Sequence, residues 1–288
     1  MSDPIPAITE AAATGEIATI FADIRHVLGV DVVNLVWRHL ATIDGALPWA
    51  WGTLRPLYID GSVIREATTL HAELALPSTP SIPAEVFAGL GLRQDDLTAI
   101  RSVLAAYDHT NAMALVALSA LRARLQGCSP SEAEAAEPMP VVAAPQARLP
   151  RLLNLTDLSP PTAALVTTLN GLGTRRPGAV LASMYRHLAH WPAYLSLAWL
   201  LLMPLNDDGQ LTRAIDRAQR VARTRADRLL VRLGDSATST RPALRTAIGA
   251  ALEPFVGDVI AKMVVICAFL RQATEGATGS TKSRRIGS

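Results

Sequence analysis

The chain has 288 residues, which is enough for one large domain or two ordinary ones. Half of the residues are apolar and 18% are charged, and this excludes disorder for the bulk of the chain. The formal net charge of +2 is spread along the sequence, with no basic stripe that carries interleaved aromatic residues, so the sequence argues against a nucleic-acid-binding protein.

Nothing in the sequence predicts a membrane segment. The most apolar stretch, 191–205, has about 15 residues and contains two prolines, whereas a spanning helix needs about 20 apolar residues. We expect this stretch to form a core helix. The first residues resemble no secretory signal, and the two cysteines, Cys128 and Cys267, have no metal-ligand spacing, so we expect a protein of the reducing cytoplasm.

The pattern of apolar residues predicts an all-α fold. Apolar residues recur at helical spacing over 17–28, and Gly29 stands where that helix would end. The same spacing covers 111–126, directly before Gly127. Residues 83–85, Pro-Ala-Glu, are typical of a first helical turn. No run of β-branched alternation indicates a strand.

The sequence contains an internal repeat. Residues 37–51 read WRHLATIDGALPWAW, and residues 185–199 read YRHLAHWPAYLSLAW. An offset of 148 gives 13 identities in 29 positions over 37–65, where unrelated segments would give about two or three. Further on, 115–127 matches 264–276 with the offset changed by one. This pattern predicts a tandem duplication.

The repeat divides the chain into two helical units, 11–127 and 151–276. Between them, 128–150 is rich in proline, alanine and glutamate and is predicted to be a linker, and 277–288 is predicted to be a loose tail. Two similar units on one chain most simply pack as an intramolecular pseudo-dimer, and the seam is the natural place for a small-molecule pocket. The sequence leaves the oligomeric state open, a homodimer included.

Three motifs resemble a known family. They are Gly-Glu-Ile followed by Phe-x-Asp-Ile-Arg at 15–25, Arg-x-Leu-Ala-Thr followed by Gly-x-Leu-Pro-x-Ala-Trp at 38–51, and Leu-Ala-x-Trp-Pro at 188–192. On these motifs, and over nearly the whole chain, the sequence resembles the group I DL-2-haloacid dehalogenases.

The resemblance implies a helical pseudo-dimeric enzyme without a cofactor, with its site between the repeats. In that family an aspartate of the second repeat activates a water, which displaces halide from C2 of a 2-haloalkanoic acid without a covalent ester. An asparagine of the first repeat helps to hold the site, and it matches Asn111. The substrate would also meet Ser183, Met184 and Tyr185, and Val32 and Leu35 on the first repeat.

The position of the family's catalytic aspartate is occupied by Met184. A thioether cannot take a proton from water as a carboxylate can, so another base would be needed for the reaction. Asp60 is one candidate, although its place before a glycine is also typical of a turn or cap. The adjacent Asp108 and His109 are further candidates, and the alternative interpretation is a helix cap before 111–126.

Other polar residues favour structural roles. His39 and His187 occupy the same place in the two repeats, beside Arg38 and Arg186, and we interpret all four as structural, with carboxylate binding by an arginine as the alternative. No phosphate loop, nucleophile elbow or metal motif is present, so no metal is predicted.

Two functional hypotheses remain on the sequence alone. The first is a cofactor-independent hydrolase of the haloacid dehalogenase type, or a derivative that acts on another small electrophile. The second is a small-molecule-binding protein that has kept the helical pocket and lost catalysis. The two hypotheses differ in whether another residue replaces the base that Met184 cannot supply.

Overall fold

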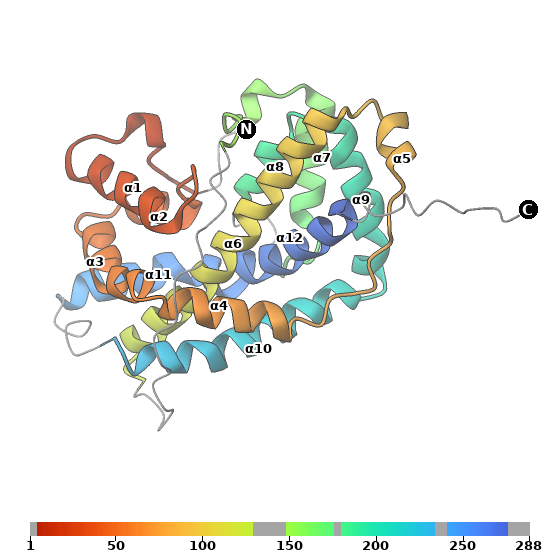
Figure 1. Cartoon of the computed structure of the whole chain (residues 1–288). Helices are drawn as coiled ribbons and strands as arrows, with labels where there is room; N and C mark the ends of the chain where they lie inside the picture. The colour runs from red at the N-terminus through yellow and green to blue at the C-terminus, as the bar shows by residue number, and fades with distance from the viewer. Residues whose placement is uncertain (1–4, 129–147, 176–179, 234–240, 276–288) are drawn as a thin grey trace, which may run out of the picture.

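The computed structural model describes residues 5–128, 148–175, 180–233 and 241–275. Within these ranges every regular element is a helix, which confirms the predicted all-α class (Figure 1). The elements are η1 (Glu10–Ala12), α1 (Gly15–Leu28), α2 (Leu35–Leu40), α3 (Ala46–Ile59), α4 (Ser62–Glu73), α5 (Ala84–Gly89), α6 (Gln94–Leu125), η2 (Leu155–Asp157), α7 (Pro160–Gly171), α8 (Ser183–Leu188), α9 (Pro192–Asp207), α10 (Gln210–Leu230), α11 (Pro242–Pro254), η4 (Phe255–Val259) and α12 (Ile260–Glu275). Most of the predicted linker, 129–147, and the whole predicted tail lie outside the described residues.

The helix predicted over 17–28 is present as α1. Its residues Phe21, Ile24 and Leu28 share one face and are buried in the core, with exposed fractions of 2% or less. Gly29 ends the helix with a φ of 64°, a left-handed conformation that glycine adopts without the strain of a side chain.

The helix predicted over 111–126 is the second half of a much longer element, α6. Its N-terminus is fixed by Asp96, whose Oδ2 accepts the backbone N–H of Arg93 at 2.9 Å. In its first half the buried face is narrow, and Leu97, Ile100 and Val103 are separated by exposed or half-buried positions. The periodic signal is therefore weaker there than after residue 110.

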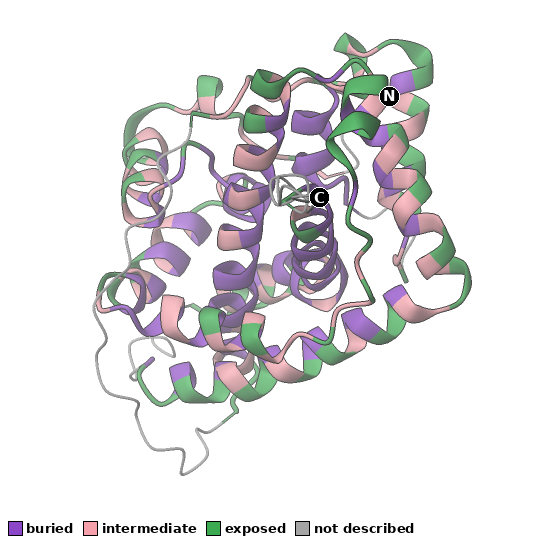
Figure 2. Ribbon diagram, turned by 45° about the vertical axis from the view of Figure 1, so that its right-hand side comes forward, coloured by how far each residue is buried: buried purple, intermediate pink, exposed green. Residues whose placement is uncertain are grey.

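Helices α6 and α12 lie side by side through the centre of the molecule (Figure 1). Helices α4 and α10 pack against each other and against α6 along one edge. Helices α1 to α3 and α11 lie at one end, while α7 to α9 lie at the other. Figure 2 shows that the central helices are buried almost all round, whereas the outer ones expose one face.

Two pairs of helices share one spacing along the chain. Helix α2 begins at Leu35 and α8 at Ser183, a spacing of 148 residues, and both are six residues long. Helices α4 and α10 begin at Ser62 and Gln210 with the same spacing. The central helix α6 is continuous, whereas 242–275 is divided into α11, the five-residue π-helix η4, and α12.

The apolar stretch 191–205 forms most of α9, whose residues Tyr194, Leu195, Ala198 and Leu202 are buried. Its opposite face reaches the surface, where Leu200 is 60% exposed. Within the described parts of the chain, none of the helices combines the length and the apolar character that crossing a membrane requires.

Candidate functional site

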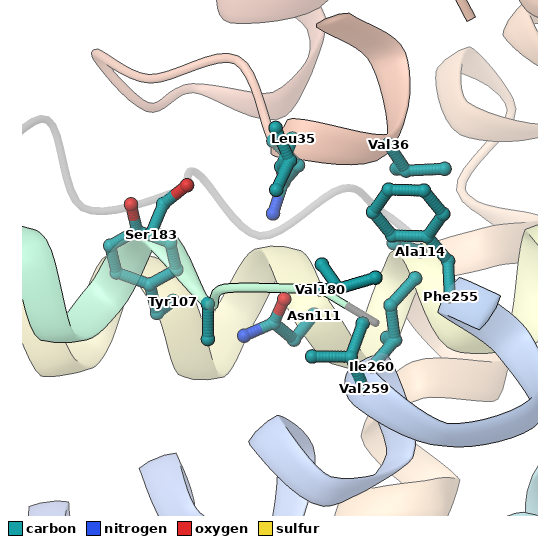
Figure 3. A pocket seen from close by; sticks show the side chains of 12 residues that line it. Leu35, Val36, Tyr107, Asn111, Ala114, Val180, Ser183, Phe255, Val259 and Ile260 are labelled. Atoms are coloured by element: carbon teal, nitrogen blue, oxygen red, sulfur yellow. The ribbon is translucent and has the colours of Figure 1, made fainter. Parts of the chain in front are cut away.

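A cavity of about 40 Å³ lies where α2, α6, α8 and the π-helix η4 meet (Figure 3). One water needs roughly 10–15 Å³ on this measure, so the cavity has room for a few waters or a small organic molecule. Its lining residues are Asn34, Leu35, Val36, Tyr107, Asn111, Ala114, Val180, Ala182, Ser183, Phe255, Val259 and Ile260.

The cavity has a polar end and an apolar end. Figure 3 shows the side chains of Tyr107 and Ser183 together at one end, with Phe255 and Ile260 at the other. The side-chain amide of Asn111 lies between these two ends. Such a site suits a small molecule with a polar group and a short apolar group.

Ser183 is connected to a buried arginine. It is the first residue of α8, and its Oγ accepts a hydrogen bond of 3.0 Å from Nη2 of Arg38 on α2. Arg38 is 4% exposed, and its Nε donates to the carbonyl of Val33 at 3.1 Å. Because an arginine stays protonated in proteins, this pair brings a positive charge behind the polar end of the cavity.

Tyr107 is connected to a buried histidine. Its hydroxyl lies 2.8 Å from Nδ1 of His187, and both residues are 3% exposed. Burial lowers the pKa of His187 to about 3, and the charges of His190, Arg38 and Arg186 act in the same direction. The ring is therefore neutral at physiological pH. Burial raises the pKa of Tyr107, so its hydroxyl keeps its proton.

Met184 does not line the cavity. It is fully buried, and its Sδ lies 3.2 Å from Sγ of Cys267 on α12. Nδ2 of Asn111 approaches the same sulfur at 3.7 Å. Burial raises the pKa of the Cys267 thiol well above its ordinary value, so this group stays protonated. The wall behind Asn111 is thus formed by two neutral sulfur atoms.

Asp108 and His109 lie on α6 but not on the face that lines the cavity. Asp108 hydrogen-bonds to Nε2 of His71 at 3.0 Å and forms an ion pair with Nη1 of Arg271 at 2.8 Å. Burial opposes the ionisation of Asp108, but these two partners outweigh it and lower its pKa. Burial also lowers the pKa of His109, which hydrogen-bonds to the backbone of Leu28.

Asp60 lies at the end of α3, outside the cavity lining. Its Oδ1 accepts the backbone N–H of Ser62 at 2.8 Å, and its Oδ2 pairs with Arg232 at 2.9 Å. Asp208 accepts the N–H of Gln210 at 2.9 Å in the same way. Both aspartates therefore have the turn geometry that an Asp-Gly pair indicates.

The structure brings together three of the six residues predicted to meet a substrate, namely Leu35, Asn111 and Ser183. The other three, Val32, Met184 and Tyr185, are buried in the core and do not line the cavity. Among the residues with described coordinates, no group of three His, Cys, Asp or Glu side chains could hold a metal ion.

Four residues of the lining were not predicted from the sequence, namely Tyr107 and, in the second half of the chain, Phe255, Val259 and Ile260. Tyr107 precedes Asn111 by four residues and so shares its helix face, a spacing that could have revealed it. The other three carry no local signal, since only the packing of η4 against α6 brings them to the cavity.

Comparison with known proteins gives two findings. No protein-family profile matches the chain. A configuration-inverting 2-haloacid dehalogenase from Alcaligenes xylosoxydans xylosoxydans is 24% identical over 307 aligned positions, which cover 98% of this chain and 99% of that protein.

Solved structures give the same result for the fold. A D-2-haloacid dehalogenase mutant superposes with a TM-score of 0.77, and the enzyme in complex with L-LA does so with the same score. Each is 17% identical to this chain and covers 94% of it, with 96% of the other chain matched. This chain has the 2-haloacid dehalogenase fold. The resemblance that the three motifs indicated is thereby confirmed.

Proposed function

We propose that this protein is a hydrolase that acts on the carbon–halide bond of a small 2-haloalkanoic acid, with the cavity as its substrate site. The observation that carries the proposal is the similarity to a configuration-inverting 2-haloacid dehalogenase over almost the full length of both chains. The presence of Asn111 and Ser183 in one cavity supports it, because the resemblance predicted both as substrate contacts.

The cavity suits the chemistry of such a substrate. The carboxylate would lie at the polar end of the cavity near Ser183, where the charge of Arg38 attracts it. The alkyl group and the halogen would lie toward Phe255 and Ile260. A water that attacks C2 from the side opposite the halogen displaces halide directly and inverts the configuration at that carbon.

The same proposal includes the architecture. The two sequence repeats would form two helical units related by a pseudo-two-fold axis, with the cavity at their seam. The common spacing of 148 residues between α2 and α8 and between α4 and α10 supports this arrangement. The cavity lining also supports it, since it draws on α2 and α6 and on α8 and η4.

The test is halide release from the two enantiomers of 2-chloropropionate, with the configuration of the lactate product determined by chiral chromatography. We expect halide release with inversion at C2. Retention of configuration would contradict direct attack by water. If there is no turnover while 2-chloropropionate raises the melting temperature, the chain is a binding protein and not a hydrolase.

A further inference from the structure

The proposed reaction needs a base, and the cavity offers one titratable side chain. Among the described residues that line the cavity, all except Tyr107 are apolar, amide or aliphatic hydroxyl side chains. The three base candidates that the sequence suggested, Asp60, Asp108 and His109, lie outside the lining. Any proton that leaves an attacking water must therefore pass first to Tyr107 or to solvent.

The hydrogen bonds around Tyr107 have a fixed direction. His187 is neutral and so carries one N–H, and it also hydrogen-bonds to the carbonyl of Pro150, which can only accept. The proton lies on the nitrogen that faces Pro150, and Nδ1 is left to accept from the hydroxyl of Tyr107 at 2.8 Å. The Tyr107 oxygen keeps its lone pairs for other donors.

Ser183 continues this chain. Its Oγ accepts from Nη2 of Arg38, so its own hydroxyl proton is free to point to Tyr107, with which it also hydrogen-bonds. The order of donation is Arg38 to Ser183, Ser183 to Tyr107, and Tyr107 to His187. A water held in the cavity would thus meet an acceptor oxygen whose own proton already points to a base.

We propose that Tyr107 and His187 together replace the missing carboxylate, with Tyr107 as the catalytic residue that takes the proton of the attacking water and His187 as the positioning residue that receives the proton of Tyr107. This inference rests on the proposed function.

The water oxygen forms a bond to C2 as the carbon–halide bond breaks, and the electron pair of that bond leaves with the halide ion. One water proton moves to the Tyr107 oxygen while the tyrosine proton moves to Nδ1 of His187, which becomes an imidazolium. Release of that proton to solvent restores the pair, and the products are a 2-hydroxyalkanoate, halide and a proton.

The strength of the base is adequate. A carboxylate has an ordinary pKa of about 3.9, and a carboxylate is the base that the resemblance implies for this reaction. The pKa of His187, about 3, lies within about one unit of that value. His187 is therefore unprotonated at neutral pH, as an aspartate is, and accepts a proton almost as readily. The charged or titratable groups that face it are Arg38, Arg186 and His190, and they set this low value together with burial.

The experiment compares Tyr107→Phe and His187→Gln with the wild-type protein. Phenylalanine keeps the ring and removes the acceptor, while glutamine still accepts a hydrogen bond from Tyr107 but cannot take its proton. We expect kcat for halide release to fall by about 100-fold or more in both variants. KM for 2-chloropropionate should change by less than about threefold, because ground-state contacts remain.

The internal repeat supplies a matched control. His39 is the counterpart of His187, but its ring bonds to the Pro6 carbonyl at 2.7 Å. It does not itself line the cavity, and its ring lies behind that of Phe255, at 5.6 Å between the ring centres. Tyr194 is a buried tyrosine whose hydroxyl bonds to Thr274 at 2.7 Å, also outside the lining. His39→Gln and Tyr194→Phe lose comparable contacts, so wild-type turnover in both would separate catalysis from folding.

A solvent deuterium experiment distinguishes proton transfer from a structural role. Because two protons move in this step, a plot of the wild-type rate against the deuterium fraction of the solvent should be curved. The same plot for the residual rate of His187→Gln should be linear. Wild-type kcat in Tyr107→Phe would overturn this inference while leaving the hydrolase proposal intact. A wild-type protein that releases no halide would overturn both.

Discussion

The Sδ atom of Met184 lies 3.2 Å from the Sγ atom of Cys267, and this contact joins α8 to α12 behind the cavity. Both side chains are fully buried. Met184 is thus part of the core packing and does not line the cavity.

The first prediction concerns Met184→Asp. A carboxylate against Cys267 would have no charged partner, so we expect the free energy of unfolding at pH 8 to fall by about 3 kcal/mol or more. Burial would raise the folded-state pKa of the new carboxyl, so the loss should grow as pH rises above the unfolded value of about 3.9. Denaturant unfolding at pH 4 and pH 8 measures this.

Met184→Leu is the control for that substitution, since it changes shape at nearly constant volume and should cost less than about 1.5 kcal/mol. If Met184→Asp is as stable as Met184→Leu at pH 8, water and donors reach the position. In that case the variant should also gain halide release.

The second prediction separates Asn111 from Asp208. Asn111→Ala removes the amide in the middle of the cavity, and we expect about a tenfold or larger loss of kcat/KM for 2-chloropropionate, or of ligand-induced stabilisation. Asp208→Ala removes a turn contact at the exposed end of α9 and should change the melting temperature alone. Unchanged binding and turnover in Asn111→Ala would show that the substrate site lies elsewhere.

The third prediction concerns Asp108, whose pKa is lowered in the folded state by His71 and Arg271 against the opposing effect of burial. A carboxyl whose pKa is lowered in the folded state stabilises the protein when the pH lies above the pKa of the unfolded state. That stability is lost as the pH falls through the pKa of the folded state. We expect Asp108→Asn to lose about 1.5–3 kcal/mol at pH 7, the range for hydrogen bonds to charged groups. The difference from wild type should shrink toward pH 3.

Glu275→Gln tests the same cluster at its exposed edge. Glu275 pairs with Arg271 at 2.8 Å, but its side chain is 51% exposed. Its loss should cost no more than about 1 kcal/mol. Equal losses in the two variants would show that burial of Asp108 does not strengthen its ion pairs.

The fourth prediction concerns Lys262, a lysine that is 1% exposed on α12 and donates to the Asn170 carbonyl at 2.7 Å. Burial lowers its pKa to about 8, although the charge of Asp258 acts in the opposite direction. The folded protein therefore gains stability as pH rises from about 8 to the unfolded value of 10.5. At about 1.4 kcal/mol per unit, this gain amounts to about 3 kcal/mol.

Lys262→Met should lack this gain, and chemical denaturation of both proteins at pH 7 and pH 10 measures the difference. The methionine variant also loses the hydrogen bond to Asn170, a cost of about 1 kcal/mol that does not depend on pH. If the free energy of unfolding changes equally between pH 7 and pH 10 in the two proteins, the amine of Lys262 reaches solvent.

Much of the fold could be predicted from the sequence, because helical periodicity is a local property. The α1 pattern of Phe21, Ile24 and Leu28 needed no tertiary information. The first half of α6 and the π-helix could not be predicted in the same way. Their conformation depends on packing against α10, α11 and α12 rather than on a broad apolar face.

The candidate site could be predicted in part. Asn111 and Ser183 follow from the resemblance, and both line the cavity. Met184 and Tyr185 do not line the cavity, because successive residues of a helix point about 100° apart and only Ser183 in α8 faces it. The partnership of Tyr107 with His187 joins residues 80 positions apart, so no local pattern could reveal it.

The π-helix η4 lies where the offset between the two halves of the sequence changes. Helices α6 and α11 begin at Gln94 and Pro242, an offset of 148, whereas Leu115 matches Val264 at 149. Under the proposed duplication, one residue would have been gained between 242 and 264, and a π-turn is the form in which a helix absorbs a single insertion without ending. The extra residue would turn α12 by about 100° relative to the matching part of α6. One insertion would thus be enough to make the two proposed copies present different faces to one cavity.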